Sequence, residues 1–505
     1  MKRNLHPLLL GLTLAFTSLL PLTASAQTLR VGLAEDPDAL DPTMARTFVG
    51  RIVFDALCDK LVDVDEKLNY VPQLATKWAW SDDGKSLTMT LRDGVTFHDG
   101  EKFDAQAVSY NIDRHKNMKG TRRGGDLKPV TGVEVMDPLT VKINLSAPYQ
   151  PLLAALADRA GMMVSPKAAE AGGEGFALKP VCSGPFKFAE RIAQDKIVLE
   201  RFDGYWGKAD IHFDKVVYLP IPDATVRLAN LKSGQLDFIE RVAASDMAGL
   251  QKEGRFKTAA ITEIGYQGLT LNVNNGEQAK TSALHDPRVR EAFELSLDRD
   301  GIVQVVMEGQ AEAGNQWVSP GSAFYAKSVP PVKRDVARAK ALLKEAGVTK
   351  PTVKLLAATT SDAQKIAQVV QAMSAEAGFD VKIQTTEFAT SLNMATKGEF
   401  EAYILAWSGR ADPDGNLYIF HGCKQALNYS GYCTPEMDAL LNLQRTQADP
   451  AARQATFEKI AQLVAKEKAV LYLYHRKWLW AYVPALSGVR DLPDGLLRVR
   501  GLKLN

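Results

Sequence analysis

The segment from Trp407 to Asp414 holds the side chains best suited to binding a small molecule. It reads Trp-Ser-Gly-Arg-Ala-Asp-Pro-Asp. An arginine offers a forked pair of hydrogen bonds to a carboxylate or a phosphate, and it cannot accept a hydrogen bond from an ammonium group. Arg410, with Trp407 and Gly409 beside it, is therefore chemically able to bind an anion. Asp412 and Asp414 are expected to serve structure, by capping the following helix or bracing Arg410; facing the ligand, they would favour an amine.

Aromatic side chains are expected to supply much of the affinity. A charge-assisted hydrogen bond contributes roughly 1.5–3 kcal/mol, whereas micromolar binding needs about 8 kcal/mol. Most ligand pockets are largely apolar and contain a few well-placed polar groups. The aromatic candidates are Trp407, Trp317, Phe48 and Tyr266. For the last three, packing in the protein core is the alternative interpretation.

The sequence lacks the patterns of common catalytic sites. It has no G-x-S-x-G, no H-E-x-x-H and no phosphate-binding glycine loop, and Ser183-Gly184 lacks the preceding glycine of a nucleophile elbow. His421 lies near Cys423, but one histidine does not make a metal site. We therefore expect a binding protein with no catalytic residue, metal or cofactor. An extracellular hydrolase is the alternative.

Residues 1–26 have the three parts of a secretory signal peptide. Met1-Lys2-Arg3 is positively charged, an apolar stretch runs from Leu8 to Leu22, and Ala24-Ser25-Ala26 is a small-residue cleavage site. A membrane anchor is the alternative, but Pro21 interrupts a stretch shorter than the ~20 residues that span a bilayer. We expect cleavage after Ala26 and a periplasmic protein.

The mature chain is predicted to be neutral and disulfide-bonded. Cleavage removes two of the 61 basic side chains and none of the 59 acidic ones, so no basic surface for nucleic acid is expected. In an oxidising compartment the cysteines are expected to pair. Cys423 and Cys433 bracket a short loop, which leaves Cys58 and Cys182 to each other. Zinc is the alternative, but no C-x-x-C occurs and the histidines are scattered.

Pattern changes along the chain predict an α/β protein with more than one core. Between residues 73 and 111, Asp-Gly turns flank the alternating strand Leu87–Arg92, which indicates β-hairpins. Beyond residue 278, helical periodicity alternates with short strands, which is typical of an α/β lobe. Residues 488–504 are predicted to be strand-like and to return to the first lobe. The helices are expected at residues 288–306, 335–346 and 363–377, and the strands at 352–356, 381–385 and 402–406.

One long stretch, residues 74–111, reads LATKWAWSDDGKSLTMTLRDGVTFHDGEKFDAQAVSYN. It resembles the signature of the bacterial extracellular solute-binding proteins of family 5, the peptide-, nickel-, opine- and glutathione-binding proteins of ABC importers. Further matches follow in order along nearly the whole mature chain. They include CSGPFKF at 182–188, DPRVREAFELSLDR at 286–299 and AWSGRADPDGN at 406–416.

The resemblance implies a two-lobed periplasmic-binding-protein fold with an extra α+β domain inserted in the first lobe. Strands near Leu269–Val273 and Val483–Leu486 would form the hinge. A ligand that contacts both lobes only when they shut would stabilise the closed form, which the importer recognises. Lobe one would comprise residues 28–68, 180–277 and 486–505, the inserted domain residues 69–179, and lobe two residues 278–485.

The resemblance also points to individual ligand-binding residues. In the family's peptide binders, an aspartate shortly after a glycine pairs with the amino terminus of the peptide; here Arg410 stands in its place, in a segment one residue shorter. Arg159 lies seven residues before Pro166, the spacing of the carboxylate-binding arginine in the nickel-binding branch. A place on the surface is the alternative for each arginine. Further candidates are Arg46 and either Arg122 or Arg123.

We therefore expect the periplasmic solute-binding component of an ABC importer, which captures a small carboxylate-bearing solute between its lobes by hinge closure. Its partners would be that ligand and the membrane permease subunits, and the protein would be a monomer. Binding of dipeptides, oligopeptides or glutathione is the alternative. A third hypothesis, which shares the fold, is a peptide or haem carrier or a receptor that hands its ligand to a chemosensor.

Overall fold

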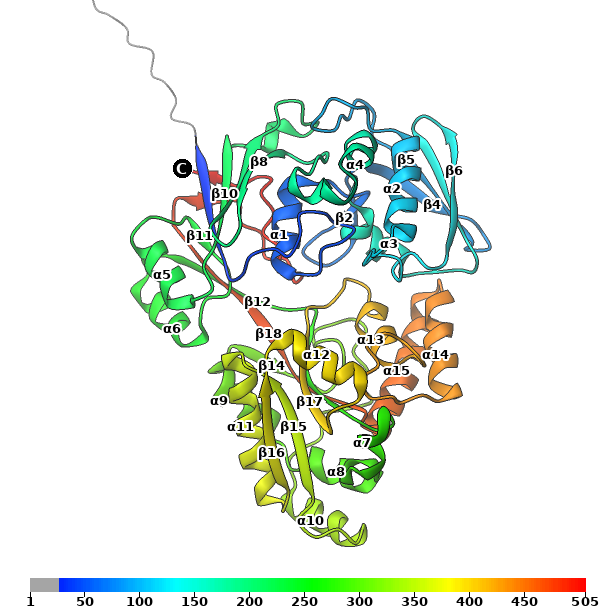
Figure 1. The fold of residues 1–505 in the computed structure, drawn as a ribbon, viewed down its shortest axis with the longest axis vertical. Helices are drawn as coiled ribbons and strands as arrows, with labels where there is room; N and C mark the ends of the chain where they lie inside the picture. The colour runs from blue at the N-terminus through cyan, green and yellow to red at the C-terminus, as the bar shows by residue number, and fades with distance from the viewer. Residues whose placement is uncertain (1–26) are drawn as a thin grey trace, which may run out of the picture.

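The computed structural model describes residues 27–505, apart from the side chains of Ser361 and Ala389. It shows two lobes, one above the other (Figure 1). The predicted signal peptide, residues 1–26, lies outside the described residues. A mixed sheet of 12 strands extends through both lobes with helices around it, so the predicted α/β class and two-lobed fold are confirmed. None of the helices between residues 27 and 505 is long and apolar enough to cross a membrane.

The upper lobe is built on the part of the sheet with strand order β11-β1-β10-β9-β8. The first strand, β1 (Thr28–Leu33), pairs in parallel with both β10 and β11. Its alternate residues share one face and are fully buried in a core with α1 (Phe48–Leu57). The other elements are β8 (Phe186–Ile192), β9 (Lys196–Arg201), β10 (Lys215–Pro220), β11 (Phe238–Ile239), α5 (Ala224–Lys232) and α6 (Ala244–Glu253).

The domain joined to the upper lobe has a four-stranded antiparallel sheet and a core of its own. The predicted hairpin is confirmed, because β4 and β5 pair on either side of the turn at Gly84, whose φ of 65° is favourable for glycine. The side chain of Asp104 accepts a hydrogen bond from the Ala107 N–H and so caps α2. The elements are β4 (Ala75–Trp80), β5 (Ser86–Leu91), α2 (Ala105–Asn117), β6 (Val130–Asp137), β7 (Thr140–Leu145) and α3 (Leu152–Leu156).

The lower lobe has the strand order β16-β15-β17-β13-β18. The strands expected at 352–356, 381–385 and 402–406 are present as β15 (Thr352–Ala358), β16 (Asp380–Thr386) and β17 (Ala402–Trp407). The helix expected at 288–306 is instead two helices, because the side chain of Asp298 caps the second one. The helices include α8 (Pro287–Leu295), α9 (Arg299–Met307), α10 (Val336–Glu345), α11 (Ser361–Glu376), α12 (Phe388–Lys397), α13 (Asp414–His421), α14 (Pro435–Thr446) and α15 (Pro450–Glu467).

Two segments of the chain pass between the lobes. One is the long strand β18 (Val470–Tyr482), whose first half pairs with β13 (Tyr266–Leu271) and β14 (Ala311–Ala313) and whose second half pairs with β12 (Lys257–Thr262). The other is residues 263–265, which join β12 to β13. The two segments lie side by side, since the N–H of Glu263 donates to the carbonyl of Arg476 over 2.8 Å.

The predicted hinge strands lie elsewhere, and that prediction was wrong. Residues Leu269–Leu271 pair with β17 inside the lower lobe, and Leu486 pairs with Leu504 in the upper lobe. Residues 488–504 were also predicted to be strand-like, but within them only Lys503–Leu504 (β20) forms a strand. It pairs with Leu486–Ser487 (β19). An apolar strand has the same side-chain pattern whether it stays in a lobe or crosses to the next.

Both predicted disulfides are present. Cys58 and Cys182, 124 residues apart in sequence, have Cα atoms 4.9 Å apart and tie the end of α1 to the segment before β8. Cys423 and Cys433 close the short loop between α13 and α14, with Cα atoms 4.8 Å apart. The first bond joins distant segments of the upper lobe, and the second is local to the lower lobe.

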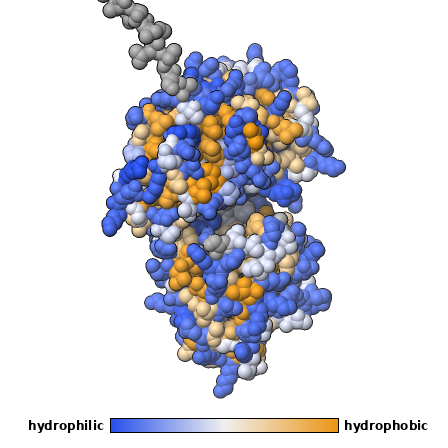
Figure 2. All heavy atoms as spheres, turned by 60° about the vertical axis from the view of Figure 1, so that its left-hand side comes forward, coloured by the Kyte–Doolittle hydropathy of each residue, from blue (hydrophilic) through white to orange (hydrophobic). Residues whose placement is uncertain are grey.

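Figure 2 shows the molecular surface hollowed at the boundary between the two lobes. The start of α1 and the end of α3 face this boundary from above, and the loop between β17 and α13 faces it from below (Figure 1). Side chains from these three places meet there, as the contacts described next show.

Candidate ligand-binding site between the lobes

Four arginines surround one carboxylate where the lobes meet. The carboxylate is that of Asp158, which precedes the short helix η1 (Arg159–Gly161). Arg51 projects from α1, and Arg410 comes from the lower lobe, from the loop between β17 and α13. Arg123 lies in the loop after α2, so the chain supplies the cluster from four separate places and the cluster exists only in the folded protein. The arginine cluster consists of Arg51, Arg123, Arg159 and Arg410, with Asp158 between them.

Asp158 joins the two lobes through ion pairs. Its Oδ1 lies 3.0 Å from the Nε of Arg51 and 3.7 Å from the Nε of Arg159, and its Oδ2 lies 3.4 Å from the Nε of Arg410. Burial tends to raise the pKa of this carboxyl group, but the surrounding arginines hold the pKa well below its ordinary value. Asp158 is therefore ionised at neutral pH and links the upper lobe to Arg410.

Positive charge exceeds negative charge in the arginine cluster. The only other carboxylate that pairs with it among the described residues is Asp126, 3.2 Å from the Nη1 of Arg123. Burial lowers the pKa of Arg410 to about 10, and burial together with the like charge of Arg123 lowers the pKa of Arg159. Within the described part of the cluster, Asp158 Oδ2 lacks a hydrogen-bond partner, and so do three buried donors: Arg51 Nη1, Arg123 Nε and Arg159 Nε. Such donors are suited to binding an anion.

The loop around Arg410 is shaped by glycines. Gly409 has a φ of 78°, and a Cβ there would lie 2.4 Å from the carbonyl carbon of Ile264, in the crossing segment. A Cβ at Gly415 would lie 2.6 Å from the Cγ of Arg410. Only glycine leaves room at these positions, so the sequence of the loop determines where the Arg410 side chain can lie.

Trp407 and Asn416 support the same loop. The guanidinium carbon of Arg410 lies 4.7 Å from the centre of the Trp407 ring, an arrangement that favours a cation. The side-chain oxygen of Asn416 accepts from the backbone N–H of Arg410 over 2.8 Å and from the Trp407 Nε1 over 3.1 Å. The structure thus brings Trp407, Gly409 and Arg410 together beside the arginine cluster.

The other predicted arginines divide into buried and exposed ones. Arg159 and Arg123 both donate to the backbone carbonyl of Ala45, over 3.0 and 3.4 Å, which holds them against the loop before α1. Arg46 does not join them, since its side chain is 70% exposed and pairs loosely with Asp38. Arg122 is exposed as well. The expectation that Arg46 faces the ligand is thus not supported by its position.

The aromatic residues predicted to bind the ligand lie in different parts of the structure. Phe48, at the start of α1, stacks on Trp478 with ring centres 4.4 Å apart, and the Arg51 guanidinium lies 5.9 Å from its ring. Tyr266 and Trp317 instead lie in the core of the lower lobe, 3% and 0% exposed. Tyr266 packs edge-on against Tyr472. Packing therefore accounts for Tyr266 and Trp317, whereas Phe48 borders the arginine cluster.

Asp412 and Asp414 are each paired with an arginine of the lower lobe. Asp412 accepts two hydrogen bonds of 2.7 Å from Arg453 in α15. The Oδ1 of Asp414 lies 3.1 Å from the Nε of Arg445 in α14, and burial raises the pKa of Asp414 to about 6. Both carboxylates thus tie the segment after β17 to α14 and α15, and their structural role stays a prediction.

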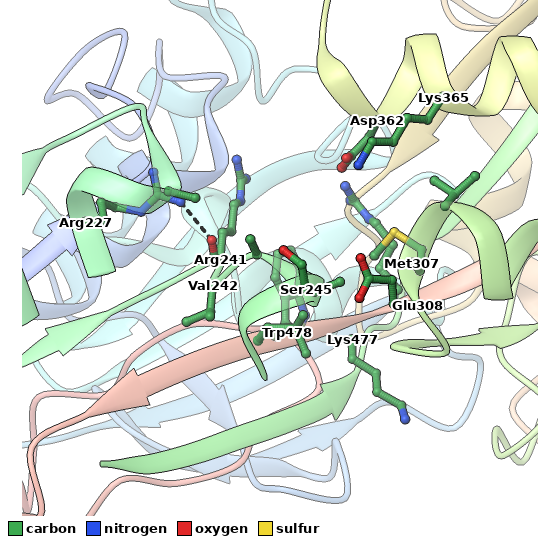
Figure 3. A pocket seen from close by; sticks show the side chains of 16 residues that line it. Arg227, Arg241, Val242, Ser245, Met307, Glu308, Asp362, Lys365, Lys477 and Trp478 are labelled. Carbon is green, nitrogen blue, oxygen red and sulfur yellow. Dashed lines mark hydrogen bonds between the residues drawn. The ribbon is translucent and has the colours of Figure 1, made fainter. Parts of the chain in front are cut away.

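A cavity of about 350 Å³ lies beside Trp478 (Figure 3). Trp478 lines it, and Arg241, also in its wall, lies 5.4 Å from the Phe48 ring. The guanidinium of Arg241 is near Glu240 and Glu35, at 3.4 and 3.7 Å. The side chains that face it come from both lobes and carry both signs of charge: Arg241, Glu308, Asp362 and Lys365.

Sequence reasoning missed Arg51, Asp158 and Trp478. Arg51 lies within a helix whose apolar residues repeat at helical spacing, where a charged residue is ordinarily expected on the solvent side. In the structure every residue of α1 is buried, because the helix lies in the core of its own lobe, which also includes Phe186, Trp478 and Leu497. The only sequence signal for Asp158 was its position directly before Arg159, a predicted ligand-binding residue.

Comparison with protein families gives one match that covers most of the chain. Residues 69–428 match the family described as bacterial extracellular solute-binding proteins, family 5 Middle. Among curated proteins, the chain is 28% identical over 483 residues to the glutathione-binding protein GsiB of Salmonella paratyphi A, and the match covers 93% of each chain. The GsiB protein of Escherichia coli O157:H7 is 28% identical over 485 residues.

Two solved structures share the fold over nearly the full length. The periplasmic binding protein DppA of Helicobacter pylori, in complex with the peptide STSA, is 25% identical with a TM-score of 0.84, covering 94% of this chain and 98% of that chain. The protein AgaA of A. tumefaciens R10, in complex with agropinic acid, is 26% identical with a TM-score of 0.83, covering 95% and 99%. These relatives bind solutes.

Proposed function

The chain belongs to the bacterial extracellular solute-binding proteins of family 5, and we propose that it captures a carboxylate-bearing solute between its lobes for an ABC importer. Proteins of this family bind small ligands or peptides and work with ABC permease subunits. The proposed location is the periplasm, and the proposed role is binding without catalysis. The remaining question is which chemical class of solute the site takes.

The surplus of positive charge around Asp158 carries the proposal. The four arginines of the arginine cluster face two carboxylates, and three of their buried N–H groups have no partner among residues 27–505. Leaving a buried donor unsatisfied costs about 1–3 kcal/mol, and more when it is charged. A ligand carboxylate would accept these hydrogen bonds and offset part of the charge. No similar site for an ammonium group is formed here, because Asp158 is already surrounded by guanidinium groups.

Closure of the lobes follows from the same geometry. Arg410 belongs to the lower lobe, whereas Arg51, Arg123 and Arg159 belong to the upper lobe and its inserted domain. A carboxylate bound among them would contact both lobes at once and so stabilise the closed form relative to the open one. Phe48 and Trp478, which border the site, offer apolar surface for the rest of the solute.

Glutathione or a related peptide is the second candidate. Two relatives with 28% identity over at least 483 residues are glutathione-binding proteins. Glutathione carries two carboxylates, so it fits the arginine cluster better than a dipeptide whose amino terminus must be bound. It also bears an ammonium group, for which the wall of the cavity offers the acidic side chains of Glu308 and Asp362.

A calorimetric titration tests the proposal. We expect carboxylic acids to bind the purified mature protein, and Arg410→Ala to weaken that binding by about 100-fold because it removes the contact from the lower lobe. Arg46→Ala is the matched control, since it removes the same charge from an exposed position 70% open to solvent. Equal binding by wild type and Arg410→Ala would refute the assigned role. Binding of free-amine dipeptides in preference to acids would refute the ligand class.

A further inference from the structure

The charges of the arginine cluster can be counted. Arg51, Arg123, Arg159 and Arg410 contribute four positive charges, and guanidinium groups stay protonated at neutral pH. Asp158 and Asp126 are the carboxylates that pair with them among the described residues. The ion pair of Arg445 with Asp414 lies outside the cluster and is balanced in itself. The arginine cluster therefore carries a net charge of plus two.

A net charge of plus two destabilises a protein when the charged groups are buried. The side chains of Arg51, Arg123 and Arg159 are 5%, 7% and 3% exposed, so water screens them little. An uncompensated buried charge costs several kcal/mol, and like charges in a low-dielectric region repel each other strongly. The lowered pKa values of Arg159 and Arg410 reflect this unfavourable environment. A ligand that brings the matching charge removes the cost.

We propose that the solute carries two negative charges at the end held by the arginine cluster, and that Asp158 sets this number. The inference rests on the proposed function and specifies its ligand class, a dicarboxylate or an equivalent dianion. Asp158 acts as a built-in carboxylate: it occupies one of the places that a ligand oxygen would otherwise take, between Arg51 and Arg410. With a neutral residue at position 158, the site would favour a ligand with one more negative charge.

Matched pairs of ligands test the inference. Succinate, glutarate and phthalate would each be compared with its own monomethyl ester, which keeps the carbon skeleton and removes one charge. We expect the best-fitting dicarboxylate to bind the purified mature protein at least about tenfold more tightly than its ester, measured by titration calorimetry at low ionic strength. Binding of an ester as tight as that of its diacid would overturn the inference and leave a monocarboxylate ligand. If none of the six compounds binds, the carboxylate class itself fails, and the proposed function with it.

Two variants test the part played by Asp158. Asp158→Asn keeps the size of the side chain and raises the net charge by one, so the affinity ratio of diacid to ester should rise at least threefold. Arg123→Gln lowers the net charge by one, so the same ratio should fall at least threefold. This ratio of affinities is insensitive to a general loss of stability. If Asp158→Asn folds poorly, the ratio measured with Arg123→Gln still tests the role of the charge count. A ratio that stays the same in both variants would overturn the role of the charge count.

Discussion

Two groups of buried ions each include residues of the segment 410–414, and the two groups differ in charge balance. Behind the loop after β17, Asp412 pairs with Arg453 and Asp414 pairs with Arg445, one carboxylate for each guanidinium. In front of it, Arg410 joins a cluster in which arginines outnumber carboxylates. The same loop, residues 408–413, thus separates a balanced ion network from an unbalanced one.

The difference separates structure from function. A network that only supports the fold satisfies its own charges, because an unpaired buried charge would destabilise the protein permanently. A binding site can remain unbalanced, since the ligand supplies what is missing when it arrives. The ion pairs of Asp412 and Asp414 are consistent with a structural role, which stays a prediction. The following predictions test this contrast, from the largest effect to the smallest.

Removing one member of the balanced network should strongly destabilise the protein. Arg453→Leu leaves Asp412 buried without its two hydrogen bonds of 2.7 Å, and we expect the free energy of unfolding to fall by about 3–5 kcal/mol. Urea denaturation followed by circular dichroism measures it. Arg338→Leu is the control, because its partner Glu345 is 51% exposed and the change should cost about 0.5 kcal/mol or less. Similar losses in both variants would contradict the assignment.

The pH dependence of stability should show the buried Asp414. Its pKa is about 6 in the folded protein, against about 3.9 in an unfolded chain. Between these pH values the folded state binds more protons, so the contribution of this group to the free energy of unfolding falls by about 2 kcal/mol as the pH rises from 4 to 6. In Asp414→Asn this decrease should vanish. Thermal unfolding of both proteins at several pH values measures the difference, and parallel curves would show an ordinary pKa.

Removing an arginine from the unbalanced cluster should affect binding and leave stability nearly intact. Arg51→Leu removes one surplus charge, and Asp158 keeps its other two arginine neighbours. We expect affinity for the solute to fall about 10- to 100-fold, or roughly 1.5–3 kcal/mol, because one charge-assisted hydrogen bond is lost. The free energy of unfolding should change by about 1 kcal/mol or less. A destabilisation as large as that of Arg453→Leu would place Arg51 among the structural ions.

The smallest expected effect concerns a contact between the lobes. Tyr149, in the upper part, accepts a hydrogen bond of 3.2 Å from the Nη2 of Arg445, which belongs to the lower lobe. Tyr149→Phe keeps the ring that stacks on the guanidinium and removes this bond, so the closed form should weaken by about 0.5–1.5 kcal/mol. Ligand affinity should fall by a factor of about three to ten, with no change in the diacid-to-ester ratio. A changed ratio would mean that Tyr149 touches the ligand.

Several features of this protein were determined by local sequence alone. The Asp-Gly turns specified the hairpin of β4 and β5, because those turns need a positive φ that few residues adopt. Cys423 and Cys433 are close in sequence and were expected to pair, which left Cys58 and Cys182 for each other. Both disulfides are present. Arg410 was singled out because it stands where peptide binders of the resembled family have an aspartate. Each of these signals lies within a few residues of chain.

Only the tertiary structure decided what surrounds Arg410. Arg51 lies 359 residues before it in sequence and Asp158 lies 252 residues before it, and neither has a neighbour that marks it as functional. Whether a charged residue of a helix faces water or another lobe depends on what packs over the helix, as α1 shows by being buried on every side. The same holds for Arg46, which looked suitable and is exposed. Charge balance is a sum over residues that folding brings together, and no stretch of sequence contains it.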